Sequence, residues 1–100
     1  MTTEFLQDAV VPPDHACLEG HFPDNPVVPG TLILQKVLQA IARQWPDTRV
    51  TEVVSAKFVS PLKPGETYTM RISQQPGGMQ FECNRSGHLL ATGRLLTSHG

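Results

Sequence analysis

Residues 19–39 read EGHFPDNPVVPGTLILQKVLQ, and this stretch decides the fold because its character changes at the centre. The first half carries His21 and then three prolines, Pro23, Pro26 and Pro29. Each proline fixes its own φ and restricts the residue before it. The second half, after Gly30, is apolar at helical spacing. The stretch therefore predicts a stiff loop that holds an imidazole and leads directly into a helix.

The helix predicted after Gly30 carries a wider apolar face than a helix on a protein surface needs. Its apolar residues are Leu32, Ile33, Leu34, Val37, Leu38, Ala40, Ile41 and Trp45. Polar residues recur at steps of four and form one narrow stripe of Gln35, Gln39 and Arg43, with Lys36 beside it. We expect a mostly enclosed helix with a single stripe in contact with water, closed by Trp45 as a core residue.

The rest of the chain reads as strands. Period-two patterns predict strands at residues 4–11, 49–59, 67–75, 79–84 and 89–97, with a short extended piece at 15–19. Turn signals PLKPGE, PGG and SGH separate the later strands. One enclosed helix followed by a run of long strands predicts an α+β fold, in which a curved antiparallel sheet wraps around one long central helix. We expect residues 1–100 to form a single domain.

Composition excludes several classes of function. The formal net charge is −1, from 8 basic and 9 acidic residues mixed along the chain, which argues against nucleic acid or a membrane surface as partner. The longest apolar segment is interrupted by polar residues and is not expected to span a bilayer. Cys17 and Cys83 match no metal pattern and are expected to be buried thiols in a reducing cytoplasm. A hydrophobic content of 39% in 100 residues suggests that a partner subunit shares the core.

Gly30 stands at the entrance of the predicted helix, nine positions after His21. Unpaired N–H groups and the helix dipole favour negative charge at such a position. A carbonyl resting there would be polarised, and an enolate formed from it would be stabilised. The stretch thus offers a candidate base, His21, and a candidate oxyanion donor, Gly30. The competing interpretation is a rigid connector with a surface histidine, as we expect for His88 and His99.

The segment GHFPDNPVVPGTLIL resembles the signature of the FabZ-type 3-hydroxyacyl-[acyl-carrier-protein] dehydratases, whose pattern is H-F-P-x-x-P-x-x-P-G-x-L. The later segment KFVSPLKPGE resembles the strand and Pro-Gly turn of the same family. The resemblance covers nearly the whole chain and implies a hot-dog fold. It also implies a dimer, with each active site at the subunit interface.

The resemblance implies a role for each matching residue. His21 would remove the C2 proton of a 3-hydroxyacyl thioester, and the amide of Gly30 would hold the thioester carbonyl. The carbonyl of Val27 would orient the imidazole, and Phe22, Pro29, Leu32 and Gln39 would contribute to substrate binding. The acyl chain would lie in an apolar tunnel along the helix. No metal or nucleotide cofactor is implied, because the acyl group arrives on the phosphopantetheine of an acyl carrier protein.

Position 35 departs from the family pattern. Fourteen residues after the histidine the family has Glu or Asp, donated by the opposite subunit, and here the residue is Gln35. Gln39 matches a family glutamine, so the alignment has not slipped. A carboxamide can hydrogen-bond but cannot donate a proton and recover it, whereas general acid catalysis is worth about 10²–10⁴-fold.

Four interpretations of Gln35 stay open. Gln35 orients the hydroxyl while His21 carries the proton; a different partner chain supplies the acid; Asp24, Glu19 or His15 substitutes; or the chain binds acyl thioesters without turnover.

The expected function is dehydration of 3-hydroxyacyl thioesters to trans-2-enoyl thioesters in fatty acid or polyene-type lipid biosynthesis. The alternatives are an impaired acyl-thioester-binding subunit paired with an active dehydratase, and a hot-dog thioesterase. Basic residues that could dock the carrier are Lys36, Arg43, Lys57 and Lys63.

Overall fold

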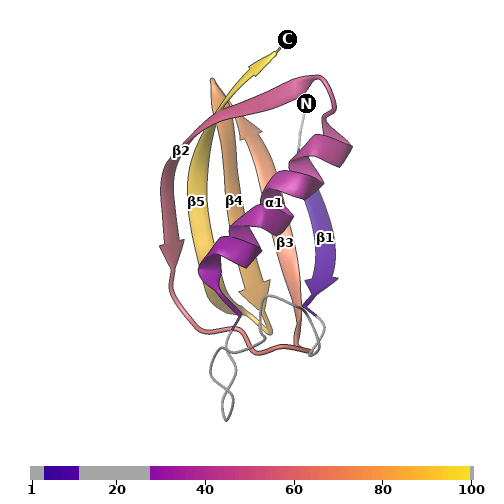
Figure 1. Cartoon of the computed structure of the whole chain (residues 1–100), viewed down its shortest axis with the longest axis vertical. Helices are drawn as coiled ribbons and strands as arrows, with labels where there is room; N and C mark the ends of the chain where they lie inside the picture. Colours follow the sequence, from indigo (N-terminus) through magenta and orange to yellow (C-terminus); the bar gives the residue numbers. More distant parts are fainter. Residues whose placement is uncertain (1–3, 12–27, 100) are drawn as a thin grey trace.

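The computed structural model describes residues 4–11 and 28–99, which form one antiparallel sheet and one helix (Figure 1). The strands are β1 (Glu4–Val10), β2 (Thr48–Phe58), β3 (Thr67–Gln75), β4 (Gly78–Arg85) and β5 (His88–His99), and the helix is α1 (Gly30–Gln44). The α+β prediction is confirmed, and the strand ends differ from the expected ones by one or two residues. The extended piece expected at residues 15–19 lies outside the described part.

The sheet has the strand order β1-β3-β4-β5-β2, and all its described pairs are antiparallel. The connections between β3 and β4 and between β4 and β5 are tight turns at the PGG and SGH signals. Gly77 and Gly87 there have φ of 76° and 79°, which glycine adopts without steric cost. The segment that carries α1 connects β1 to β2 at opposite edges of the sheet. The helix therefore crosses the sheet between its two edge strands.

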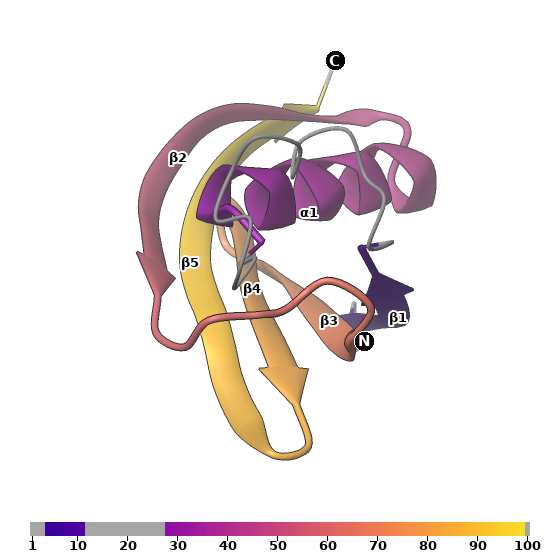
Figure 2. The ribbon, with the colours of Figure 1, turned by 60° about the horizontal axis from the view of Figure 1, so that its bottom comes forward.

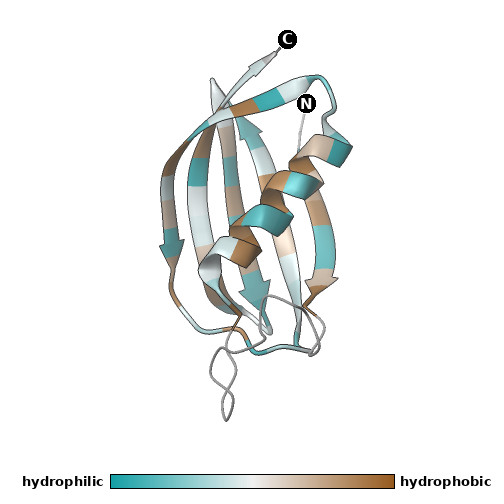
Figure 3. Ribbon diagram, viewed as in Figure 1, coloured by the Kyte–Doolittle hydropathy of each residue, from teal (hydrophilic) through white to brown (hydrophobic). Residues whose placement is uncertain are grey.

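The sheet curves around α1, which lies against its concave face (Figure 2). The helix contributes Leu32, Ile33, Val37, Ala40 and Ile41 to the core. Inward-facing residues of the sheet complete it, namely Tyr68, Met70, Ile72, Met79, Phe81, Cys83, Ala91 and Leu95. Along β3 and β4, buried residues alternate with partly buried or exposed ones, which is the period-two pattern of strands with one face on a core. Figure 3 colours these strands by the hydropathy of each residue. One layer of helix on one layer of sheet thus forms the core.

The polar stripe expected on the helix is present, because Gln35, Gln39 and Arg43 are all exposed. Trp45 ends the helix and is partly buried against the core, with its ring edge-on to Phe5 at a centroid distance of 6.1 Å. Both expectations are confirmed. Cys83 is fully buried as expected, whereas Cys17 lies outside the described residues.

Strand β2 forms one edge of the sheet and is the least buried strand. Its pairing with β5 is interrupted by register shifts between Val50 and Glu52 and between Val53 and Ser55. Such irregularities bend and twist a strand, which agrees with the strong curvature of β2 in Figure 2. Val53, Val54 and Phe58 remain exposed on it. In the described part of the chain, no helix is long and apolar enough to cross a membrane.

Candidate active site at the start of the helix

Helix α1 begins without a side-chain cap. The carbonyl oxygen of Pro29 accepts hydrogen bonds from the amides of Leu32 and Ile33, with N···O distances of 3.0 and 3.4 Å. No acidic residue lies in the first turn. Among the described residues, none accepts a backbone hydrogen bond from the amide of Gly30 or Thr31. Within the described part of the chain, these two N–H groups at the positive end of the helix dipole therefore have no backbone acceptor.

Backbone hydrogen bonds hold this helix start against the segment that follows β2. The amide of Val28 donates to the carbonyl of Leu62 at 2.8 Å, two residues before the helix begins. The amide of Gly65 donates to the carbonyl of Val11 at 2.7 Å. The KFVSPLKPGE segment thus fixes the chain on both sides of residues 12–27. Two motifs that are about thirty positions apart in the sequence meet here.

The ring of Phe58, the last residue of β2, lies against Gly30. An added Cβ at Gly30 would lie 2.9 Å from each of three ring carbons, Cδ1, Cδ2 and Cε1. That separation is shorter than real Cβ contacts, so a side chain at position 30 would displace the ring. Glycine at this position therefore serves close packing of the helix start under an aromatic ring, as well as access to its amide.

The predicted site residues fall into three groups. His21, Phe22 and Val27 lie outside the described residues. Pro29 and Gly30 are partly buried at the helix start, while Leu32 is buried in the core on the side of the sheet. Gln35 and Gln39 lie on the exposed stripe. Within one chain, then, Gly30 and Gln35 belong to the same end of the helix, and the side chain of Gln35 is open to a partner subunit.

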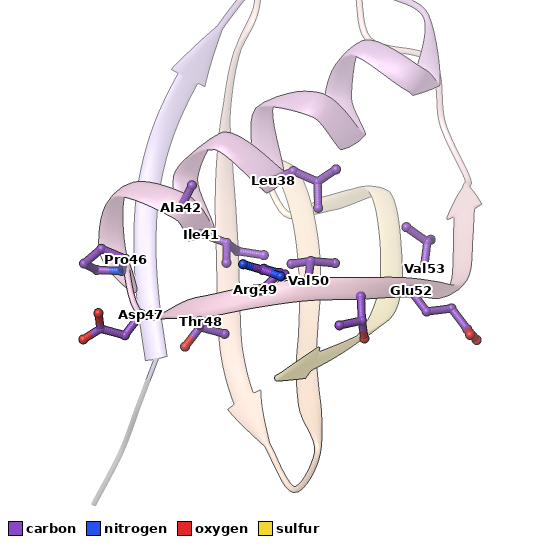
Figure 4. Close-up of a pocket in the computed structure, with 11 residues that line it drawn as sticks. Leu38, Ile41, Ala42, Pro46, Asp47, Thr48, Arg49, Val50, Glu52 and Val53 are labelled. Atoms are coloured by element: carbon purple, nitrogen blue, oxygen red, sulfur yellow. The ribbon is translucent and has the colours of Figure 1, made fainter. Parts of the chain in front are cut away.

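A groove of about 670 Å³ lies beside the second half of α1 (Figure 4). Leu38, Ile41 and Ala42 line one side, and residues 46–53 at the start of β2 line the other. Leu38 follows Gly30 by eight residues, which is about 12 Å along a helix. The groove is thus separate from the helix start, and it lies along the helix axis from Gly30. The acyl tunnel expected along the helix stays a prediction.

Two buried groups on the sheet have shifted proton affinities. Burial raises the pKa of the Cys83 thiol to about 12. Burial, with a contribution from nearby Cys83, raises the pKa of the Tyr68 hydroxyl to about 12. Both groups are therefore neutral at physiological pH and act as packing residues. No cluster of three or more His, Cys, Asp or Glu side chains that could hold a metal exists among the described residues.

Comparison with solved structures defines the class of the protein. The dehydratase heterocomplex ApeI:P from Xenorhabdus doucetiae aligns with a TM-score of 0.82 and 21% identity, over 96% of this chain and 88% of that chain. The (R)-hydratase from A. caviae involved in PHA biosynthesis aligns with a TM-score of 0.75 and 15% identity, over 99% and 96%. With a curved sheet around one helix, the fold is a hot-dog fold.

The sequence comparisons then define the family. The model of the ApeI-like family, described as ApeI dehydratase, matches residues 2–94, and the chain belongs to this family. The 3-hydroxyacyl-[acyl-carrier-protein] dehydratase FabZ of Ehrlichia chaffeensis is 31% identical over 88 residues, or 77% of this chain. The chain spans 62% of that relative's length. The FabZ-like resemblance inferred from the HFP and Pro-Gly motifs is thereby confirmed.

The sequence did not indicate two features near the site. Phe58 was part of the matched KFVSPLKPGE segment, yet its contact with Gly30 was not foreseen. The groove formed with residues 46–53 was also missed, because it arises only when β2 folds back beside the helix. A glycine directly after Pro29 was the available signal for close packing, but it does not tell which residue packs there.

Proposed function

We propose that this protein dehydrates 3-hydroxyacyl thioesters carried by an acyl carrier protein, giving trans-2-enoyl thioesters. The observation that carries the proposal is the family match over residues 2–94. The helix start fits this chemistry, because the amides of Gly30 and Thr31 lie at the positive end of α1 and have no acceptor among the described residues. The ordinary setting for such a reaction is fatty acid or polyene-type lipid synthesis in the cytoplasm.

The proposed reaction is an elimination of water, and the protein's part in it is to move protons and stabilise charge. His21 removes the C2 proton, and the electron pair of that C–H bond moves into an enolate. The enolate oxygen accepts a hydrogen bond from the N–H group of Gly30. The enolate then collapses to form the C2–C3 double bond, and the C3–O bond breaks. The leaving hydroxyl takes a proton and departs as water. The imidazolium formed at His21 can return that proton, because its pKa lies near neutrality.

The proton donor for the leaving hydroxyl is the open step of this scheme. Gln35 can accept and donate hydrogen bonds but cannot supply a proton. Its exposure on the helix stripe supports a position at a subunit interface. We propose that Gln35 orients the hydroxyl, and that an acidic side chain of a different partner raises the rate where such a partner is present. The solved neighbour ApeI:P is itself named a dehydratase heterocomplex.

The partner is proposed to pair along the edge strand β2. Among the described strands, β2 is paired only with β5, so its other edge has free backbone groups. Val53, Val54, Phe58 and Val59 are exposed on and after it. A long apolar edge of this kind is a template for pairing with another strand. Either a second copy or a related hot-dog chain could occupy it. Lys57 and Lys63, both exposed, are candidates for contact with the acidic carrier.

The second candidate is an acyl-thioester-binding subunit that completes an active partner. Gln35 favours it, because the family acid is missing from this chain. A thioesterase is favoured less: the family match is to dehydratases, and the fluoroacetyl-CoA-specific thioesterase FlK aligns with a TM-score of only 0.63 and 16% identity.

The experiment is hydration of short-chain trans-2-enoyl thioesters, and dehydration of 3-hydroxyacyl thioesters, by the purified protein with and without carrier. We expect turnover by the wild type and its loss in His21→Ala, with His88→Ala as the matched control at an exposed histidine. A wild type that is inert on all substrates, yet binds them, would favour the binding subunit. Release of free thiol without enoyl formation would favour the thioesterase.

A further inference from the structure

Phe58 places one face of an aromatic ring on the residue proposed to hold the thioester carbonyl. Two ring carbons on opposite sides, Cδ1 and Cδ2, lie at the same 2.9 Å from an added Cβ of Gly30, as does Cε1. Equal distances to these three atoms mean that Gly30 faces the plane of the ring rather than its edge. The face of the ring therefore lies against Gly30 at the helix start.

The backbone of Phe58 is fixed from both sides. Phe58 is in register with Ala91 on β5, which is the last pair of the β2–β5 ladder. The next two amides, of Val59 and Ser60, both donate to the carbonyl of Leu90, at 2.7 and 3.2 Å. A side chain that leaves such an anchored backbone has few conformations. The position of the ring over Gly30 thus starts from a backbone that β5 holds in place.

The rest of the ring is open. Phe58 is 48% exposed although one face covers Gly30, so about half of a large apolar side chain is available to another group beside the helix start. An apolar wall next to a hydrogen bond with an anion excludes water and lowers the local dielectric constant. Both effects strengthen the attraction between an N–H group and a developing negative charge.

We propose that Phe58 is a wall of the acyl-thioester site, with one ring face supporting Gly30 and the open part contacting the substrate beside its carbonyl. This inference rests on the proposed function and adds a residue that determines the stability of the enolate. The ring would shield the enolate oxygen from water and press the C1–C2 segment toward the amide. The preferred substrate is then an acyl thioester that is unbranched at C2, because a branch at C2 would collide with the ring.

The experiment separates enolate formation from loss of water. A saturated acyl-pantetheine thioester lacks the C3 hydroxyl, so the enzyme can only exchange its C2 protons for deuterium from heavy water, which NMR measures. We expect Phe58→Ala to slow this exchange about 10-fold or more, and Phe58→Leu to retain most of the rate, because leucine restores an apolar wall. Leu6→Ala is the matched control, at an exposed apolar residue of β1 on the other edge of the sheet. Circular dichroism and the urea midpoint check that each variant folds.

The outcomes distinguish the two proposals. Exchange by the wild type that persists unchanged in Phe58→Ala overturns the inference and leaves the proposed function standing. Exchange that falls equally in Leu6→Ala also overturns it, since the effect would then follow the loss of any exposed apolar side chain at a sheet edge. Equal rates for a 2-methyl thioester and its unbranched analogue contradict the contact at C2. A wild type that neither exchanges nor dehydrates any thioester overturns both proposals.

Discussion

The ring of Phe81 lies over Gly93 on the neighbouring strand, in the space that a side chain at position 93 would occupy. An added Cβ there would lie 2.6 Å from the Phe81 Cζ and 2.5 Å from the carbonyl oxygen of Ser55. The Ser55 oxygen belongs to the backbone of β2, so a rotamer change cannot relieve this clash. We expect Gly93→Ala to lower the free energy of unfolding by about 1–3 kcal/mol, the usual cost of overpacking. Urea unfolding measures this, with Arg94→Ala, at an exposed neighbour, expected within about 0.5 kcal/mol of the wild type. A Gly93→Ala protein as stable as the wild type would contradict the packing.

The hydroxyl of Tyr68 is buried and has no hydrogen-bond partner within the described residues. Burial of an unsatisfied polar group costs free energy, so its removal without loss of volume should be favourable. We expect Tyr68→Phe to raise the free energy of unfolding by about 1 kcal/mol. Tyr68→Leu, which also removes ring volume, is expected to lower it. Both are read from urea midpoints, and a destabilised Tyr68→Phe protein would mean that the hydroxyl is bonded after all.

The stability of the fold should fall at alkaline pH. The folded-state pKa of both Cys83 and Tyr68 is raised to about 12, above ordinary values of 9.0 and 10.0. The unfolded chain therefore loses these protons first as the pH rises, and the linked stability is present below about pH 9 and lost between about pH 9 and 12. Urea midpoints over this range measure the loss. The variant Cys83→Ala should reduce the slope between pH 9 and 10, where the Cys83 thiol of the unfolded chain titrates ahead of the Tyr68 hydroxyl; an unchanged slope would contradict the assignment.

Replacement of Gln35 by glutamate restores the acid of the family pattern. Residue 35 is exposed on the helix stripe, so the carboxylate needs no burial in the isolated chain. We expect Gln35→Glu to raise kcat of the protein alone by about 10²-fold, the lower end of what general acid catalysis contributes. Gln44→Glu, at an exposed glutamine at the far end of the same helix, is the matched control and should have no such effect. A fall in kcat for Gln35→Glu would instead mean that the amide is the working group.

The free edge of β2 should control assembly. Val54 is 49% exposed on β2, while Leu6 is 60% exposed on β1, the other edge of the sheet. A lysine on an edge strand opposes pairing with another strand, because its charge would be brought against an apolar surface. We expect Val54→Lys to shift the protein to a monomer in analytical ultracentrifugation, and Leu6→Lys to leave the assembly unchanged. The reverse result would move the interface to β1.

Much of the fold could be predicted because local patterns were strong. The apolar spacing after Gly30 predicted the helix, and the two glycine turns at Gly77 and Gly87 placed the last three strands within two residues of their ends. The stripe of Gln35, Gln39 and Arg43 followed from the helical repeat alone. Within the candidate site, one long sequence motif was enough to identify Gly30. The same motif showed that position 35 departs from the family pattern. The predicted roles of His21, Phe22 and Val27 stay predictions.

The order of the strands across the sheet, by contrast, depends on long-range pairing that no local pattern encodes. The same holds for the contact between Phe58 and Gly30 and for the groove beside Leu38, which join segments far apart in the chain. The sequence by itself determined which residues form the helix and strands and which motif marks the family, because backbone geometry and side-chain periodicity act over a few residues. Only the tertiary structure decided which ring lies against the helix start and which strands form the edges of the sheet, because packing brings together surfaces whose distance along the chain carries no information about their contact.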